Sequence, residues 1–329
     1  MKLERGTVGC NKTSDKRESR GNTPKRFSLL KLTLLAVAVC VITLLAAALI
    51  STSENKRIGT AVYTVSSSKI ETDGLRIVLI SDLHRTRFDE TNQQLVDVTA
   101  EQHPDLICVD GDMLERSCTE EEVEALSDLF SRLMAVAPVY FSAGNHDYKV
   151  YFNKTDIVGH EYVSGEGKSA VLQKLENTGA VFLENDYLDV EVCGQKLRLG
   201  GFYSKAYRTE EDTDESWSAR ETFLSKYCDT DSYKLMLSHR PQSFEPEKSG
   251  SDPDIDLILS GHTHSGVICL PFGLGAIWTE DGFFPKYDKG EFDIGTAQLI
   301  ITSGLAGYGW IPRVFNPPEI AVIELLPEK

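Results

Sequence analysis

Five short apolar runs in this sequence are each followed at once by Asp, Asn or His. The runs are LRIVLI (75–80), DLICV (105–109), PVYFSA (138–143), YKLML (233–237) and IDLIL (255–259). Runs of this length, rich in β-branched residues and bounded by Gly and polar residues, predict buried strands. Two further runs, AQLIIT (297–302) and IAVIEL (320–325), predict strands near the end of the chain.

Helical patterns lie between the early strands. Residues 119–134 open with a capping box formed by Thr119 and Glu122, followed by apolar residues at helical spacing. Residues 93–102 and 168–177 show similar patterns, whereas residues 180–202 predict a hairpin that turns at Cys193-Gly194. Strands that alternate with helices indicate layered α/β architecture, and the hairpin indicates a mixed sheet system.

The residues that follow the five strands are the candidate functional residues. They are Asp82 and His84, then Asp112, then Asn145, His146 and Asp147, then His239, and finally His262 and His264. Ligands of open α/β sheets bind at the carboxyl ends of strands, so these side chains are expected to converge. Five of the seven histidines in the chain fall in these loops, which independent turn residues would not do.

The residue types in these loops predict a metal site. Imidazole, carboxylate and amide ligands suit Zn, Mn or Fe(II), and the absence of thiolates argues against a structural zinc site. Seven candidate ligands are too many for one ion with an open position, but they suit two ions that share a carboxylate. Two such ions, roughly 3.5–4 Å apart, stabilise both the attacking and the leaving oxygens in phosphate ester hydrolysis.

The order DxH, GD, GNHD, SH and GHTH resembles the calcineurin-like metallophosphoesterase family over residues 75 to 326. Later stretches, including LPFGLGAIW, ITSGLAGYG and PRVFNPPEIAVIEL, resemble the membrane-associated bacterial branch with YkuE-like and YaeI-like members. The resemblance implies a four-layer α/β/β/α sandwich of two mixed sheets.

It also implies a role for each candidate residue. Asp82, His84 and His264 would hold one divalent ion; Asn145, His239 and His262 would hold the other; and Asp112 would bridge the two. His146 would contact the phosphate and act as general acid, and Asp147 would orient His146.

Two departures from the family pattern stand out. GDMLE places Glu115 where the family often has Asp, at a position that is not usually a direct ligand. GHTHSGV replaces GHTHGGQ, so that Ser265 and Val267 would alter the pocket wall rather than the metal ions.

A separate feature of the chain is the uncharged stretch LTLLAVAVCVITLLAAALI, residues 32–50. Its 19 residues come close to the ~20 needed for a membrane-spanning helix, and they exceed a typical signal-peptide core. The interpretation is an uncleaved anchor, with cleavage near Ala46–Ala48 as the alternative. The domain plan is therefore a basic cytoplasmic tail (1–31), a transmembrane anchor (32–50), a linker or leading strand (51–70) and a catalytic domain (71–329).

The distribution of charge sets the expected orientation and partners. Residues 1–31 hold nine Lys/Arg, whereas only Lys56, Arg57 and Lys69 follow the span within the next twenty residues. The positive-inside rule then places the N-terminus in the cytoplasm and the catalytic domain outside. The net charge of −16 argues against a general nucleic-acid binder.

The sequence thus predicts a membrane-anchored phosphoesterase that uses metal-activated hydroxide on a phosphodiester or pyrophosphate. Lipid-linked or envelope-derived phosphates are the natural candidate substrates, and residues 270–285, which include Trp278, Phe283 and Phe284, suggest a hydrophobic lip for them. Arg240 and Arg313 are candidate phosphate contacts. The alternatives are a phosphomonoesterase or protein phosphatase and, from another class, a metal-binding sensor ectodomain without turnover.

Overall fold

The computed structural model describes residues 26–152, 168–203, 213–244, 253–270, 275–279, 282–307 and 313–328. The chain divides into two compact units, Met1–Ala46 and Ala47–Lys329. Helix α1 (Arg26–Glu54) includes the whole uncharged stretch 32–50. Within the described part of the chain, no helix combines the length and the apolar character that crossing a bilayer requires. Residues 1–25 of the predicted basic tail, and His160, lie outside the described residues.

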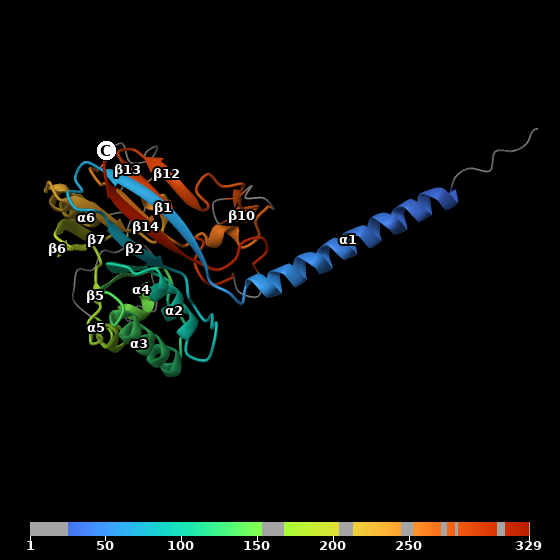
Figure 1. Ribbon diagram of the computed structural model, residues 1–329, viewed down its shortest axis with the longest axis horizontal. Coiled ribbons are helices and arrows are strands. Elements are labelled where there is room, and N and C mark those ends of the chain that lie inside the picture. The colour runs from blue at the N-terminus through green and yellow to red at the C-terminus, as the bar shows by residue number, and fades with distance from the viewer. Residues whose placement is uncertain are drawn as a thin grey trace, which may run out of the picture. The chain divides into compact units, whose positions relative to one another are not determined.

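The second unit contains a six-stranded mixed sheet in the order β1-β14-β2-β3-β4-β5 (Figure 1). Its strands are β1 (Gly59–Ser67), β2 (Leu75–Ile80), β3 (Leu106–Asp110), β4 (Val139–Ser142), β5 (Val181–Phe182) and β14 (Glu319–Pro327). Strands β2 to β5 are parallel, β14 runs antiparallel to β2, and β1 pairs in parallel with β14. The segment 51–70 therefore contributes an edge strand to this sheet.

A second six-stranded sheet has the order β12-β13-β9-β8-β7-β6. Its strands are β6 (Asp186–Val192), β7 (Gln195–Gly201), β8 (Tyr233–Leu237), β9 (Leu257–Ser260), β12 (Gly290–Ile294) and β13 (Ala297–Ile301). The four central strands are parallel and both edge strands are antiparallel. The predicted hairpin is β6–β7, and Cys193 (φ 50°) and Gly194 (φ 81°) both adopt the left-handed backbone that a tight two-residue turn requires. A short pair, β10 (Trp278–Thr279) and β11 (Gly282–Phe283), stands apart from both sheets.

Five helices cover the sheets of the second unit in its described part. They are α2 (Gln93–Glu101), α3 (Glu120–Met134), α4 (Asp147–Tyr151), α5 (Ala170–Glu176) and α6 (Asp214–Cys228). The predicted capping box is present, since the Thr119 side chain accepts from the Glu122 amide and the Glu122 side chain accepts from the Thr119 amide. Helix α6 was not predicted; it begins after Thr213, whose side chain caps it by accepting from the Ser216 amide.

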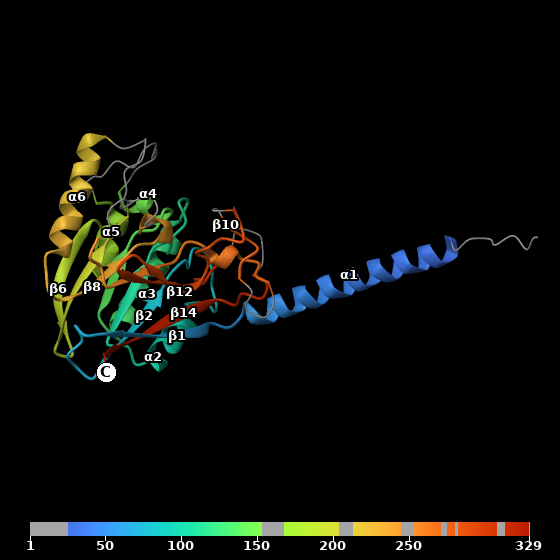
Figure 2. The same cartoon turned by 90° about the horizontal axis from the view of Figure 1, so that it is seen from above.

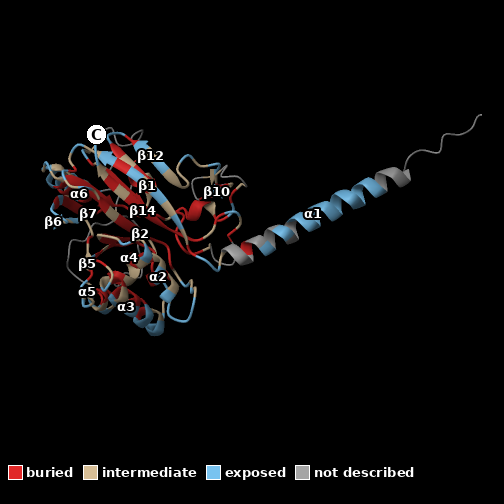
Figure 3. Ribbon diagram, viewed as in Figure 1, coloured by how far each residue is buried: buried red, intermediate tan, exposed pale blue. Residues whose placement is uncertain are grey.

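Alternating side chains on β2 show how the layers are built. Ile77 and Leu79 point into a core shared by both sheets, whereas Val78 and Ile80 point into a second core beneath α2, α3, α4 and α5. A third core packs α6 onto the outer face of the second sheet, where Figure 2 shows α6 beside β6 and β8. Buried residues concentrate in the central strands, as Figure 3 shows. The second unit is thus a mixed two-sheet α/β sandwich with helices on both outer faces.

Candidate metal centre

The five predicted loops meet at the carboxyl ends of strands from both sheets. Residues Asp82 and His84 follow β2, Asp112 follows β3, Asn145 and His146 follow β4, His239 follows β8, and His262 and His264 follow β9. Because the sheets pack face to face, these strand ends face one another across the sandwich. Three groups of potential metal-ligating atoms result, each within 4.8 Å: Asp82, His84 and His264; Asp112, His239 and His262; and His84, Glu115 and His146.

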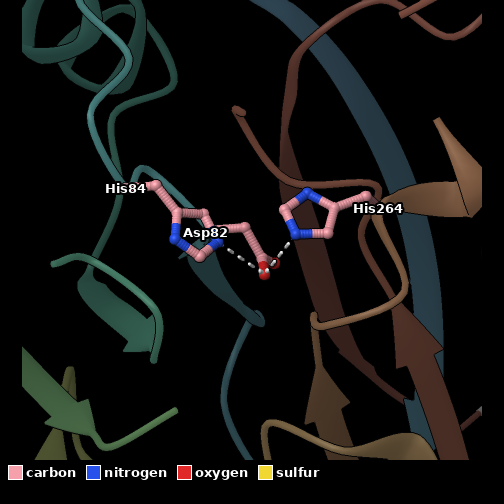
Figure 4. Close-up of side chains that lie close together, drawn as sticks. All are labelled: Asp82, His84 and His264. Carbon is pink, nitrogen blue, oxygen red and sulfur yellow. Dashed lines mark ion pairs between the residues drawn. The ribbon is translucent and has the colours of Figure 1, made fainter. Parts of the chain in front are cut away.

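The first group is centred on the carboxylate of Asp82, which is completely buried. Its Oδ1 lies 3.5 Å from Nε2 of His264 and 4.0 Å from Nε2 of His84, so both imidazoles point at one oxygen (Figure 4). The two imidazole rings stack with centroids 5.3 Å apart. This arrangement presents two nitrogens and one oxygen toward a single point.

Asp112 links the second group to the first. Asp112 Oδ2 lies 3.2 Å from Nε2 of His239 and 3.7 Å from Nε2 of His84. The other oxygen, Oδ1, accepts a hydrogen bond of 2.7 Å from the backbone amide of His146. Asp112 is thus held by its neighbours in a position between the two groups, as expected for a bridging carboxylate.

Backbone carbonyls determine which nitrogen each imidazole presents. Nδ1 of His239 donates to Asp110 O at 2.7 Å, and Nδ1 of His264 donates to Ala306 O at 3.0 Å. A carbonyl can only accept, so Nδ1 carries a proton and Nε2 is the nitrogen that faces the carboxylates. Metal-ligating histidines are typically oriented in this way by hydrogen bonds outside the ligand set.

Several buried polar atoms of the site have no hydrogen-bond partner within the described structure. They include Asn145 Oδ1, His84 Nε2 and His239 Nε2. A buried polar atom left unpaired costs roughly 1–3 kcal/mol, and such atoms are rare in native proteins. Amide oxygen, imidazole and carboxylate are also the donor types that borderline and harder divalent cations select. The residues present therefore fit a divalent metal site.

The charges of the buried side chains also favour a bound cation at this site. Burial opposes the charged form of Asp112, but the neighbouring His239 outweighs it and holds the pKa of Asp112 below its usual value. Burial likewise opposes protonation of His239, but Asp112 and Asp82 raise its pKa to about 10. The buried carboxylates of Asp82 and Asp112 both lie within 4.0 Å of His84 Nε2. Two negative charges this close together need a compensating cation, which can be a proton or a metal ion.

The backbone of the site is strained. Asp82, His84, Asp112, His262 and His264 have φ values of 56°, 48°, 52°, 68° and 47°. Left-handed conformations at non-glycine residues cost on the order of 1–3 kcal/mol each and concentrate at functional sites. Five of the seven predicted ligands adopt this conformation. The backbone strain therefore lowers the stability of these loops while it orients the ligand side chains.

Two glycines allow the loops to approach one another closely. A Cβ at Gly144 would lie 2.2 Å from Asp112 Oδ1, and a Cβ at Gly261 would lie 2.4 Å from Asp82 Oδ2. Such contacts are far inside van der Waals range. The glycines of GNHD and GHTH are therefore required by the packing against the two carboxylates.

The structure assigns the orientation of His146 to Glu115 rather than to Asp147. Glu115 Oε2 lies 2.8 Å from His146 Nδ1, and Oε1 lies 3.1 Å from His84 Nδ1. Asp147 is buried, and its carboxylate accepts from the backbone amides of Met113, Leu114 and Gly144. The expectation that Asp147 orients His146 is replaced by a role in fixing the loop that carries Asp112.

The two predicted arginines have different environments. Arg313 is buried and donates to the carbonyl oxygens of Ser303, Ala306 and Asn316, so it is committed to the backbone and cannot reach a phosphate. Arg240 lines the pocket beside the metal centre, and its Nε has no hydrogen-bond partner among the described residues. Only Arg240 keeps its place as a candidate phosphate contact.

Comparison with known proteins decides the family. Residues 75–266 match the calcineurin-like phosphoesterase family, and this match covers more than half of the chain. The chain belongs to that family. That family is one of phosphoesterases.

Among its relatives, YkuE of Bacillus subtilis, an uncharacterized metallophosphoesterase, is 27% identical over 83% of this chain and 87% of its own length. The phosphodiesterase YaeI of Escherichia coli is 26% identical over 76% of this chain and 82% of its own length. A zebrafish transmembrane protein with a metallophosphoesterase domain is 27% identical over 77% of this chain. The chain spans about half of the zebrafish protein (53%) and 60% of an uncharacterized Helicobacter pylori relative.

Proposed function

We propose that this chain is a membrane-anchored, two-metal phosphodiesterase whose catalytic unit lies outside the cytoplasm. The observation that carries the proposal is that Asp82, His84 and His264 form one group of ligand-type side chains and Asp112, His239 and His262 form another. Asp112 Oδ2 also lies 3.7 Å from His84 Nε2, which links the two groups. One ion would be held by Asp82, His84 and His264, and the other by Asn145, His239 and His262, with Mn, Zn or Fe as the fitting metals. When bound, the two ions supply an activated water and neutralise phosphate charge.

The remaining chemistry belongs to side chains of this protein. His146 is about 29% exposed and lines the pocket, so it can meet a phosphate ester oxygen. With its Nδ1 held by Glu115, the ring presents Nε2 to the leaving oxygen and can donate a proton there. Arg240 and Arg116 line the same pocket and would attract the phosphate anion.

A diester or pyrophosphate substrate is favoured over a monoester by the relative YaeI, which is named a phosphodiesterase. The pocket beside the metal centre has a volume of about 380 Å³, which leaves room for a substituent on each side of phosphorus. The alternative in the same class, a phosphomonoesterase or protein phosphatase, would turn over monoesters faster than diesters. The Glu115–His146 pair argues against a sensor without turnover, because a metal-binding module has no use for an oriented proton donor.

The membrane anchor is part of the proposal. The uncharged stretch 32–50 lies within the 29-residue helix α1 and follows a basic N-terminal segment. The zebrafish relative is named a transmembrane protein, which supports a membrane location for this chain. The positive-inside rule then puts residues 71–329 outside the cytoplasm, where lipid-linked or envelope-derived phosphodiesters are accessible.

The test is hydrolysis of bis-p-nitrophenyl phosphate by the full chain in detergent, purified without chelator and supplied with Mn, Zn or Fe in turn. Turnover that depends on metal, exceeds that of p-nitrophenyl phosphate, and disappears in Asp112→Ala and His146→Ala supports the proposal. Faster monoester turnover would favour the phosphomonoesterase. Bound metal without turnover of either ester would favour the sensor.

A further inference from the structure

An exposed group of apolar side chains lies beside the metal pocket. We call it the apolar rim; its members are Ile268, Trp278, Phe283, Phe284 and Phe315. Phe283 and Phe284 are 75% and 65% exposed, which is unusual for adjacent aromatic residues. Large contiguous apolar surfaces on a soluble domain typically mark an interaction site.

Backbone pairing joins the segments that carry the residues of the apolar rim. Trp278 pairs with Phe283 across β10 and β11, and the amide of Phe284 donates to Ile277 O at 3.1 Å. The amide of Ile277 donates in turn to Ile268 O at 3.1 Å. Ile268 also forms a bridge with Val314, the residue before Phe315. The segments that carry the five side chains are therefore joined directly.

The rim is continuous with the substrate pocket. Ile268, Ile277 and Trp278 line the pocket on one side, and His146 and Arg240 line it with the metal-site residues. Ile268 and Trp278 therefore line the pocket and also belong to the exposed apolar rim. A substrate that reaches His146 with its phosphate has an apolar surface beside it that leads out to Phe283 and Phe284.

The attachment of the apolar stretch 32–50 indicates what covers the rim. Ser51 follows that stretch directly, and its hydroxyl donates to the carbonyl of Arg313, two residues before Phe315. The Asn55 side-chain amide approaches the same carbonyl at 3.4 Å. A bilayer that holds residues 32–50 would therefore lie next to the segment that carries part of the rim.

Charges near the rim also suit a lipid surface. Lys56 and Arg57 are exposed immediately after α1, and Lys286 is exposed two residues after Phe284. Aromatic residues favour the interface between the bilayer and water, and basic residues are attracted to lipid phosphates.

We propose that the apolar rim inserts into the surface of the bilayer that anchors the chain, and that the pocket takes a phosphodiester embedded in that bilayer. This inference rests on the proposed function. In the reaction, a bond forms between water oxygen and phosphorus, the bond from phosphorus to one ester oxygen breaks, and that oxygen gains a proton. The products are a phosphomonoester and an alcohol, one of which keeps the lipid chains.

Tryptophan quenching tests insertion directly in the full chain reconstituted into vesicles. The variant Trp217→Phe with Trp310→Phe leaves Trp278 as the reporter, whereas Trp278→Phe with Trp310→Phe leaves Trp217, which lies on α6. Brominated phosphatidylcholine should quench at least half of the Trp278 emission and little of the Trp217 emission. Equal quenching of both reporters, or none of Trp278, would overturn the insertion of the rim.

A second experiment tests the substrate class. The double variant Phe283→Ser with Phe284→Ser leaves the pocket-lining residues unchanged, and Leu188→Ser is a control at an exposed apolar residue on β6. The rim variant should lose at least tenfold activity on phosphatidyl-p-nitrophenol in vesicles and stay within twofold of wild type on soluble bis-p-nitrophenyl phosphate. Equal effects on both substrates, or the same loss in Leu188→Ser, would overturn the inference. A wild-type protein inactive on both substrates would instead refute the proposed function, and the quenching experiment would still test the rim.

Discussion

Glu115 contacts two histidines at once: its Oε2 lies 2.8 Å from His146 Nδ1, and its Oε1 lies 3.1 Å from His84 Nδ1. One carboxylate therefore orients both the proposed general acid and a proposed ligand. The close contact with His84 is the main cause that lowers the pKa of Glu115 to about 2, so the residue stays ionised at neutral pH.

Replacing Glu115 with Gln should lower kcat roughly 10–100-fold on a soluble diester, the usual effect of losing an orienting partner. The Gln side chain has the shape of Glu but only one acceptor oxygen, so it cannot present an acceptor to both imidazoles. KM should change little, because Glu115 is not in the pocket lining. Glu101→Gln, at an exposed position on α2, is the matched control. Wild-type kcat in Glu115→Gln would show that the pair does not serve catalysis.

Asn316→Ala should weaken metal binding about tenfold or more. Asn316 is buried, and its side-chain amide donates to the backbone carbonyl of His264 at 2.7 Å. Losing this bond frees the strained loop that aims His264. Metal affinity measured by competition with a chelator checks the prediction, with the exposed Asn177→Ala as control. Identical affinities in the two variants would contradict it.

Gly144→Ala should abolish metal-dependent activity, with a loss of more than about 100-fold, because the new methyl group would overlap the Asp112 carboxylate. Gly59→Ala is the matched control, since its Cβ would meet nothing closer than 3.4 Å. Bound metal and turnover should be measured for both variants. An active Gly144→Ala protein would mean that the loop has more room than the structure shows.

Thr119→Ala should lower the free energy of unfolding by about 1 kcal/mol, the usual contribution of an N-cap side chain. The lost hydrogen bond caps α3 and no other element, so diester turnover should be unaffected. Chemical denaturation checks the first point and a standard assay the second. A change in turnover without a change in the free energy of unfolding would contradict the assignment of Thr119 as a purely structural N-cap of α3.

Much of the fold could be predicted because its strands are short, apolar and buried. The runs at 75–80 and 233–237 match β2 and β8 residue for residue. Helix α6 was missed because its apolar residues, including Phe223 and Tyr227, are few and its first turn is acidic. Its packing partners come from the second sheet, which no local pattern reveals.

The candidate metal residues could be predicted from their place after strands. The structure brings six of them together in two groups: Asp82, His84, His264, Asp112, His239 and His262. The partner of His146 could not, because Asp147 is its neighbour in sequence while Glu115 reaches it from another loop. Arg313 was similarly misjudged. A charged residue near a proposed phosphate site suggests a ligand contact, but its burial among carbonyl oxygens is a tertiary property.

An anomalous difference map from crystals of the full chain grown with Mn tests the two-metal assignment directly. We expect two peaks roughly 3.5–4 Å apart, the usual spacing of a two-metal site, with Asp112 between them. Asp82, His84 and His264 should surround one peak, and Asn145, His239 and His262 the other. A single peak, or peaks away from these residues, would contradict the two-metal assignment.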